Sequence, residues 1–116
     1  MIDIEYFREY CLAKKGVEEG TPFGEDILVF KAGGKIFLLC SINEFNFVNM
    51  KCDPEYAIEL RERYSGVTPG YHMSKKHWNS VSTDGSVPAE LFYQLIDHSY
   101  EMIIKSLPKK LRDQFL

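Results

Sequence analysis

Apolar residues recur along the first part of the chain at the spacing of a helix that is buried on one side. Ile4, Phe7 and Cys11 lie three or four positions apart and therefore fall on one helix face. Asp3 precedes this run and is a residue type that caps helix starts, while Gly16 follows it and is typical of helix ends. The pattern predicts a first helix between Asp3 and Gly16.

The chain then turns at residues 21–24 and continues with segments that are typical of strands. Residues 27–32 and 35–41 are rich in β-branched and aromatic side chains, and a Gly-Gly pair at 33–34 separates them. Because both glycines tolerate positive φ, the two runs are predicted to form a tight hairpin. A third strand is predicted over 45–51.

A second helix is predicted directly after this third strand. Asp53 can cap its start, Pro54 suits the first helical position, and Ser65-Gly66 can end it. The side chains expected on its buried stripe are Ala57, Leu60 and Tyr64.

Two short strands and a long helix are predicted for the remainder of the chain. The strands span 68–73 and 77–83, joined around Ser74-Lys75-Lys76. The helix begins at Pro88 and is broken by Pro108 before a short helix over 109–115. The stripe predicted to face the sheet, against Val29 and Phe37, comprises Leu91, Leu95, His98 and Met102, flanked by Phe92, Ile96 and Ile103.

The predicted order is α-β(3)-α-β(2)-α with a short terminal helix. Strands linked by hairpins, with helices at the ends of the sheet, favour a two-layer α+β fold with an antiparallel sheet over a doubly wound parallel sheet. The length of 116 residues fits one domain spanning 1–116, which can bury a core without metal or disulfide support.

Charge is unevenly distributed along the chain. The net charge of −3 argues against indiscriminate binding to polyanions. Acids dominate residues 1–26, whereas residues 63–83 contain Arg63, Lys75 and Lys76 and no acid, and the segment after Lys105 is again basic. The molecule can therefore be polarised despite its acidic total.

The sequence also predicts where the protein is found and the state of its cysteines. No apolar run approaches the roughly 20 residues that span a bilayer, and the acidic start lacks the pattern of a signal peptide, so no membrane association and a cytoplasmic location are expected. Cys11, Cys40 and Cys52 are odd in number and widely spaced, which favours reduced, buried thiols.

Six segments distributed over almost the whole chain form a specific combination. They are Thr21-Pro22-Phe23-Gly24, Phe30-Lys31-Ala32-Gly33-Gly34-Lys35, Asn49-Met50-Lys51-Cys52-Asp53-Pro54, Pro69-Gly70-Tyr71-His72-Met73-Ser74-Lys75-Lys76-His77-Trp78-Asn79, Asp97-His98-Ser99-Tyr100 and Leu107-Pro108-Lys109-Lys110. In this combination the chain resembles the MmcQ/YjbR-like family of small bacterial domains. The resemblance implies a two-layer fold similar to that of type III secretion chaperones. It also implies DNA binding, a role proposed for the family from its likeness to a double-wing DNA-binding shape.

The segment 69–79 carries the candidate binding residues. It combines aromatic rings that can stack on bases with cations that can meet phosphates, and it contains no carboxylate. Alternation along the last strand places Trp78 beside the small Ser80 and Ser82, which would leave its ring partly open. The alternative is that Trp78 packs under the helices and that the lysines only solvate a turn. The candidate nucleic-acid-binding residues are Tyr71, His72, Lys75, Lys76, His77, Trp78 and Asn79.

Metal, cofactor and catalytic sites are not expected. His72 and His77 have no Cys, Asp or Glu near them in sequence that would complete a ligand set, and no phosphate-binding glycine motif occurs. His98 and Ser99 point about 100° apart on a helix, so they do not form a base and nucleophile pair. Cys52 precedes a helix start, which can activate a thiol, or it is simply a buried small residue at that junction.

The residues thus favour a non-enzymatic module that binds DNA or RNA through the basic-aromatic turn, with help from Arg61, Arg63 or the basic tail. The alternative is a protein-interaction or chaperone-like module with no nucleic-acid binding. The residue pattern does not indicate an oligomeric state.

Overall fold

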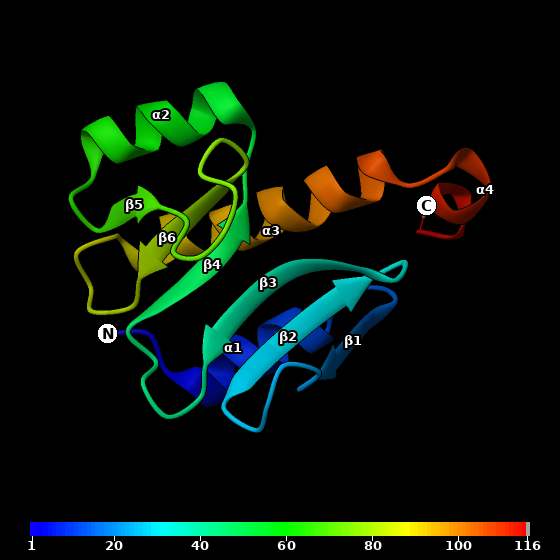
Figure 1. The fold of residues 1–116 in the computed structure, drawn as a ribbon, viewed down its shortest axis with the longest axis horizontal. Helices are drawn as coiled ribbons and strands as arrows, with labels where there is room; N and C mark the ends of the chain where they lie inside the picture. The colour runs from blue at the N-terminus through cyan, green and yellow to red at the C-terminus, as the bar shows by residue number, and fades with distance from the viewer. Residues whose placement is uncertain (116) are drawn as a thin grey trace.

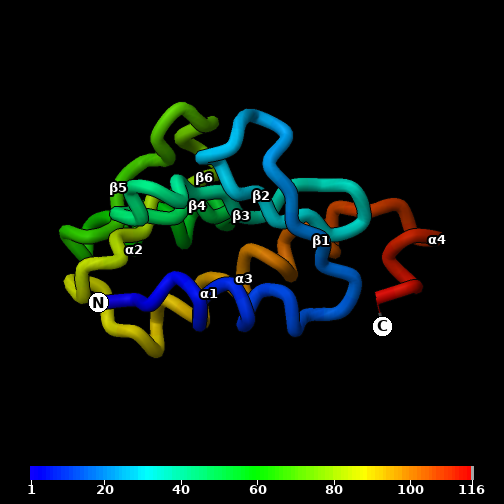
Figure 2. Tube along the Cα trace, turned by 90° about the horizontal axis from the view of Figure 1, so that it is seen from below, coloured from blue at the N-terminus to red at the C-terminus, as the bar shows by residue number. Residues whose placement is uncertain are grey.

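The computed structural model describes residues 1–115 and consists of an antiparallel sheet with two helices on one face (Figures 1 and 2). Helices α1 and α3 form this second layer, and α2 runs beside the edge strand β5. The elements are α1 (Ile4–Leu12), β1 (Val17–Gly20), β2 (Ile27–Ala32), β3 (Lys35–Ser41), β4 (Phe47–Lys51), α2 (Pro54–Arg63), β5 (Val67–Pro69), β6 (Trp78–Ser82), α3 (Ala89–Ser106), α4 (Lys109–Arg112) and the 3₁₀ helix η1 (Asp113–Phe115). The predicted α+β class is confirmed.

The sheet has six strands in the order β1-β2-β3-β4-β6-β5, one more than the sequence predicts. The missed strand is β1, whose Val-Glu-Glu-Gly sequence lacks apolar alternation. It pairs with β2 from Val17 opposite Ala32 to Gly20 opposite Val29. Arg8 on α1 donates two hydrogen bonds to the Glu19 carboxylate, which ties this edge strand to the helix layer. Tertiary contacts, rather than hydrophobic pattern, therefore account for β1.

Other predicted elements are close to those observed. Asp3 and Asp53 accept the capping hydrogen bonds of α1 and α2 from the backbone N–H groups three residues on. The β2–β3 hairpin turns through Gly33, where φ is 59° and the Leu107 side chain packs so closely that a Cβ would meet it at 2.6 Å. Glycine is therefore required at position 33 for two independent reasons. Strand β5, however, ends at Pro69 instead of continuing to residue 73.

Alternation along the strands separates a core face from an outer face. Paired residues on neighbouring strands share a face, so a row of partners across the sheet lies on one side. One such row is entirely in the core: Leu28, Cys40, Val48, Val81 and Val67. The next row points away from α1 and α3 and defines what we call the helix-free face: Val29, Leu39, Asn49, Ser80 and Thr68. Val29 thus does not pack against the last helix as predicted.

Aromatic side chains fill the centre of the core. Phe7 on α1 lies 5.6 Å from Phe30, 5.2 Å from Phe45 and 6.2 Å from Phe92 between ring centroids. Phe37 is the extra residue of a β-bulge, because Phe30 pairs with Leu38 and Lys31 with Ile36. The bulge allows Phe37 and Leu38, neighbours in sequence, both to be fully buried.

The buried face of α3 is rotated from the predicted stripe. Its buried residues are Phe92, Leu95, Ile96, Ser99 and Ile103, whereas Leu91, His98 and Met102 are only half-buried. The small Ser99 lies at the centre because its hydroxyl meets the sheet directly. It donates to the Phe37 carbonyl and accepts from the Lys51 N–H at 2.9 Å. A hydrophobicity pattern does not detect a serine used in this way.

Replacing Ser99 by Ala should destabilise the protein by about 1 to 3 kcal/mol, because it leaves the Phe37 carbonyl and the Lys51 N–H buried without partners. Denaturant unfolding measures the change. The matched control is Ser106→Ala at the exposed end of the same helix, for which a change within about 0.5 kcal/mol is expected. Equal effects of the two substitutions would show that the Ser99 bridge contributes nothing specific.

Candidate functional site

A turn over residues 70–77 connects β5 to β6 and stands on the helix-free face, opposite α1 and α3 (Figure 2). A buried polar pair in the sheet holds its start. Ser80 donates to Asn49 at 2.5 Å and accepts from the Tyr71 N–H at 2.9 Å, while the Asn49 amide donates to the Tyr71 carbonyl at 3.1 Å. His72 then adopts φ of 57°, a left-handed conformation that reverses the chain. These contacts hold the backbone from which the Tyr71 ring projects.

Two cations close the turn from inside. The Arg61 guanidinium on α2 donates to the Lys75 carbonyl and, at 2.7 Å, to the Asn79 side-chain oxygen. The Lys75 ammonium donates to the Gly70 carbonyl at 3.0 Å. Asn79 is 1% exposed and its amide faces α2 at the Ala57 carbonyl. Asn79 therefore positions the turn and cannot meet a ligand in this arrangement.

Trp78 is 8% exposed, so the expectation of a partly open ring is wrong. It lies on the helix-free face but is covered there. Gly70 packs so closely on its Cβ that a side chain at position 70 would meet it at 2.7 Å, and the Lys51 ammonium lies 5.5 Å from the ring centroid. The alternative of burial is correct, although the tryptophan is covered from the outer side of the sheet and not by the helices of the core.

The remaining candidates are accessible. Tyr71, His72, Lys75 and Lys76 are exposed, and His77 is half-buried. The structure adds Lys51, which the sequence could not place beside the turn because strand pairing was not known. Arg61, named from the sequence as a helper of the turn, reaches it from α2. The ion pairs within residues 1–115 are Arg8–Glu19 and Lys14–Asp97. None of the four cations around the turn therefore has a carboxylate partner in the described part of the chain.

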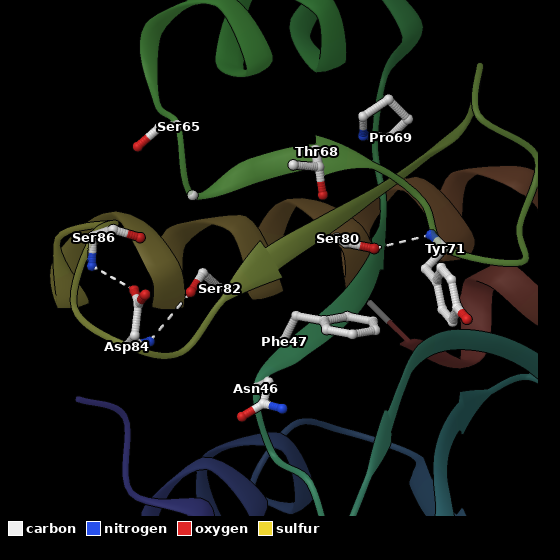
Figure 3. Close-up of a pocket in the computed structure, with 11 residues that line it drawn as sticks. Asn46, Phe47, Ser65, Thr68, Pro69, Tyr71, Ser80, Ser82, Asp84 and Ser86 are labelled. Carbon is white, nitrogen blue, oxygen red and sulfur yellow. Dashed lines mark hydrogen bonds between the residues drawn. The ribbon is translucent and has the colours of Figure 1, made fainter.

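A polar hollow of about 430 Å³ lies next to the turn on the same face (Figure 3). Phe47 and Tyr71 stand at one side of it, with their rings edge to face at 5.9 Å. Asp84 lies at the other side, where hydrogen bonds from Ser86 and Ser82 lower the pKa of its carboxyl to about 2. The hollow is thus polar and anionic at the end far from Tyr71. Its other lining side chains are Asn46, Ser65, Thr68, Pro69, Ser80, Ser82 and Ser86.

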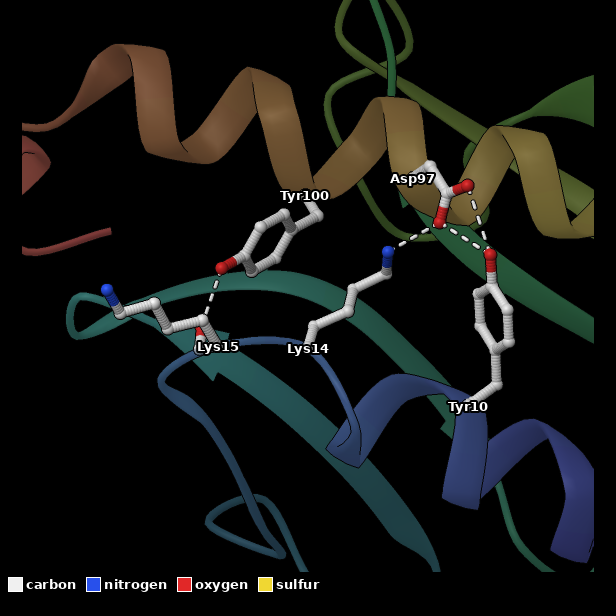
Figure 4. Close-up of polar contacts among 5 residues, drawn as sticks. All are labelled: Tyr10, Lys14, Lys15, Asp97 and Tyr100. Atoms are coloured by element: carbon white, nitrogen blue, oxygen red, sulfur yellow. Dashed lines mark hydrogen bonds and ion pairs between the residues drawn. The ribbon is translucent and has the colours of Figure 1, made fainter. Parts of the chain in front are cut away.

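A second polar cluster joins α1 to α3 (Figure 4). The Tyr10 hydroxyl donates to the Asp97 carboxylate at 2.8 Å, and the Lys14 ammonium lies 2.5 Å from the same group. Burial, together with the hydrogen bond to Asp97, raises the pKa of Tyr10 to about 12, so its phenol keeps its proton at neutral pH. The Tyr100 hydroxyl donates to the Lys15 carbonyl at 2.6 Å. These contacts tie two helices together and offer no ionised nucleophile.

The other groups with possible chemistry are structural. His98 accepts a hydrogen bond from the Asp53 N–H at 3.1 Å, and burial lowers its pKa. Cys52 is buried, and burial raises the pKa of its thiol to about 12, which favours the inert, protonated thiol over the activated thiolate. Within residues 1–115 no three His, Cys, Asp or Glu side chains form a group able to hold a metal. No helix there is long and apolar enough to cross a membrane.

Comparison with known proteins identifies the family. The YjbR family model matches residues 12–102, which is most of the chain. The chain belongs to the YjbR family. It is 41% identical to the uncharacterised Escherichia coli protein YbdF over 99 residues, covering 84% of this chain and 80% of that protein. It is 33% identical to E. coli YjbR over 105 residues, covering 90% and 89%.

Solved structures support the same fold for this YjbR-family chain. The crystal structure of Deinococcus radiodurans protein DR2400, described as a DUF419 domain, superposes with a TM-score of 0.93 at 34% identity. That match covers 99% of this chain and 88% of DR2400. A Pseudomonas syringae protein superposes with a TM-score of 0.75 at 25% identity, covering 88% and 99%. The YjbR family and the two-layer α+β fold are thus confirmed.

The three cysteines should be unreactive in the folded protein, because all are buried and burial raises each thiol pKa. A chromogenic disulfide reagent should label none of them quickly under native conditions and all three after unfolding. Rapid labelling of one native thiol, lost in Cys52→Ser, would contradict the inert role of Cys52.

The stability of the protein should fall as the pH drops below about 6.5, the ordinary histidine value. The lowered pKa of His98 means that the unfolded chain binds a proton more readily than the folded chain, so acid favours unfolding. Denaturant unfolding at about pH 7.5 and 5.5 should show a smaller difference for His98→Gln than for the unmodified protein. Replacing the exposed His72 by Gln should leave the change in unfolding free energy between the two pH values as it is in the unmodified protein. An equal reduction of that change in both variants would contradict the assignment to His98.

Proposed function

We propose that this YjbR-family protein binds single-stranded DNA or RNA across the 70–77 turn. The observation that carries the proposal is a group of cations around an exposed aromatic ring, none of which has a carboxylate partner among residues 1–115. Lys51, Arg61, Lys75 and Lys76 surround the turn, and Tyr71 is 59% exposed beside them. Rings that stack on bases beside cations that meet phosphates are what binders of single strands use.

Tyr71, instead of the covered Trp78, supplies the stacking surface in this proposal. Its ring lies 4.0 Å from the His72 ring and is supported edge to face by Phe47 at 5.9 Å. Because Asn49 and Ser80 hold its backbone, little conformational freedom is lost when a base stacks on it. Such stacking contributes about 1 to 3 kcal/mol per base.

Charge separation reconciles the proposal with an acidic protein. The net charge is −3, but the acidic helix α1 lies on the opposite side of the sheet from the turn (Figure 2). Interactions between exposed charges are largely screened beyond roughly 10 Å at moderate salt, so a strand at the turn is affected mostly by the local cations. Asp84, at the far side of the polar hollow, sets a limit to the path of a phosphate backbone on this face.

Removing both turn lysines in Lys75→Ala/Lys76→Ala should weaken binding to every single strand and reduce the salt dependence. Two lost phosphate contacts lower the slope of log affinity against log salt by roughly 1.4. Tyr71→Ala should cost about 1 to 3 kcal/mol and leave that slope unchanged. Fluorescence anisotropy of labelled oligo-dT and oligo-U at several salt concentrations measures both effects.

The matched control is Lys109→Ala/Lys110→Ala, which removes an adjacent exposed lysine pair from α4. The fold places α4 far from the 70–77 turn, although the sequence suggested the basic tail as a helper (Figures 1 and 2). This control changes the net charge equally, so a specific site predicts a much smaller effect from it. Absence of binding at low salt, or equal effects of the two lysine pairs, would contradict the proposal. Salt-tolerant capture of a polypeptide would instead favour the protein-interaction alternative.

A further inference from the structure

The helix-free face also carries a largely apolar groove, which adjoins the polar hollow of Figure 3 at Asn46, Phe47 and Tyr71. Its volume is about 560 Å³, within the roughly 300 to 1,000 Å³ that is typical of small-molecule sites. The outer sides of β2, β3 and β4 form its floor with Ile27, Ile36, Leu39 and Phe47. A sheet face that is left uncovered by helices thus presents a cavity of ligand size.

Two loops form the walls of this groove. The loop that leads into β2 and the 70–77 turn both rise on the side of the sheet opposite α1 and α3 (Figure 2). Phe23 projects from the first loop with 65% of its surface exposed, and Tyr71 projects from the second with 59% exposed. Met73 completes the second wall. Exposed aromatic side chains on both walls can lose their contact with water when an apolar ligand lies between them.

The charged groups of the groove are carboxylates. Asp26 and Glu44 line it together with the imidazole of His72, whereas no lysine or arginine of residues 1–115 does. The Ser41 hydroxyl donates to Asp26 at 2.7 Å and accepts from the Glu44 backbone N–H at 3.0 Å, which places both acids near the β3 end of the groove. The Asn43 N–H also donates to Asp26 at 2.6 Å. These hydrogen bonds lower the pKa of Asp26, so it stays ionised at neutral pH.

We infer that this groove binds a small amphiphilic amine, with an aromatic or branched apolar body between Phe23 and Tyr71 and a protonated amino group toward Asp26 and Glu44. The apolar floor favours a ligand with an apolar body, and the carboxylates favour one whose end group is positively charged. An anionic ligand of the same size would be repelled from the same end. The inference does not rest on the proposed nucleic-acid function, because the cations at the turn do not line the groove.

Three probes with the same ring system and different end groups test this inference: tryptamine, indolepropionate and the neutral tryptophol. Binding is followed by titration with methyl NMR, which reports on Ile36, Leu39 and Met73 in the groove. For a probe of about a dozen heavy atoms, dissociation constants in roughly the millimolar range are expected. Tryptamine should bind roughly tenfold more tightly than indolepropionate at low salt, with tryptophol between them.

Two variants separate the apolar and electrostatic contributions. Phe23→Ala removes the exposed ring of one wall and should weaken the binding of all three probes several-fold, since each has the same apolar body. Glu44→Gln should weaken tryptamine about threefold and leave tryptophol unchanged. Glu25→Gln removes a neighbouring exposed carboxylate that does not line the groove, so it should change the affinity for neither tryptamine nor tryptophol. Lys76→Ala, which leaves the Lys75 bond to the Gly70 carbonyl intact, should not weaken tryptamine binding, which distinguishes this site from the nucleic-acid site.

Several results would overturn the inference. Absence of saturable shifts at the Ile36, Leu39 and Met73 methyls would show that the groove does not take such ligands. Indolepropionate binding as tightly as tryptamine would show that the carboxylates do not select charge. Tryptamine binding that is unaffected by both Phe23→Ala and Glu44→Gln would place the ligand elsewhere on the molecule.

Discussion

The sheet depends on a hydroxyl group at the point where its two central strands separate. The pairing of β3 with β4 ends at Leu38 and Met50, and beyond it the strands diverge (Figure 1). Ser99 of α3 occupies this opening, accepting from the Lys51 N–H and donating to the Phe37 carbonyl. Two backbone groups that would otherwise be buried without partners are thereby satisfied, which constrains both the position and the rotation of the helix.

The adjacent His98 extends the same constraint to α2. Its ring accepts from the Asp53 N–H while Asp53 caps the start of α2. Arg61 on α2 then bonds to Lys75 and Asn79, so the position of α2 determines the shape of the 70–77 turn. The candidate site is thus connected, contact by contact, to the serine that joins α3 to the sheet.

Helices α1 and α3 cover only one side of the sheet, so the helix-free face is covered in part by loops. The loop before β2 and the 70–77 turn rise on this outer face and create two kinds of surface there (Figure 2). Cations that pair with no carboxylate of the described chain gather around Tyr71, whereas carboxylates lie at one end of the apolar groove. Tyr71 contributes to both surfaces because it lies on the border between them.

The sequence by itself determined the features that local physics controls. Three features depend on residues near in the chain, and each was predicted correctly: Asp3 and Asp53 as caps, the glycines of the β2–β3 hairpin, and the alternation that puts Trp78 and Ser80 on one face of β6. The acid-free segment and the family resemblance were visible there too. Strand β1 could not be predicted, because Arg8 and pairing with β2 stabilise it instead of its own hydrophobicity.

Only the tertiary structure decided which candidate side chains are accessible. Burial depends on what lies opposite a residue in space, and strand pairing brought Lys51 and Gly70 onto Trp78 and turned Asn79 toward α2. Tyr71 remains exposed because distant Asn49 and Ser80 hold its backbone at the rim of the face. The sequence thus located the turn and its composition, whereas long-range pairing determined which of its residues face solvent.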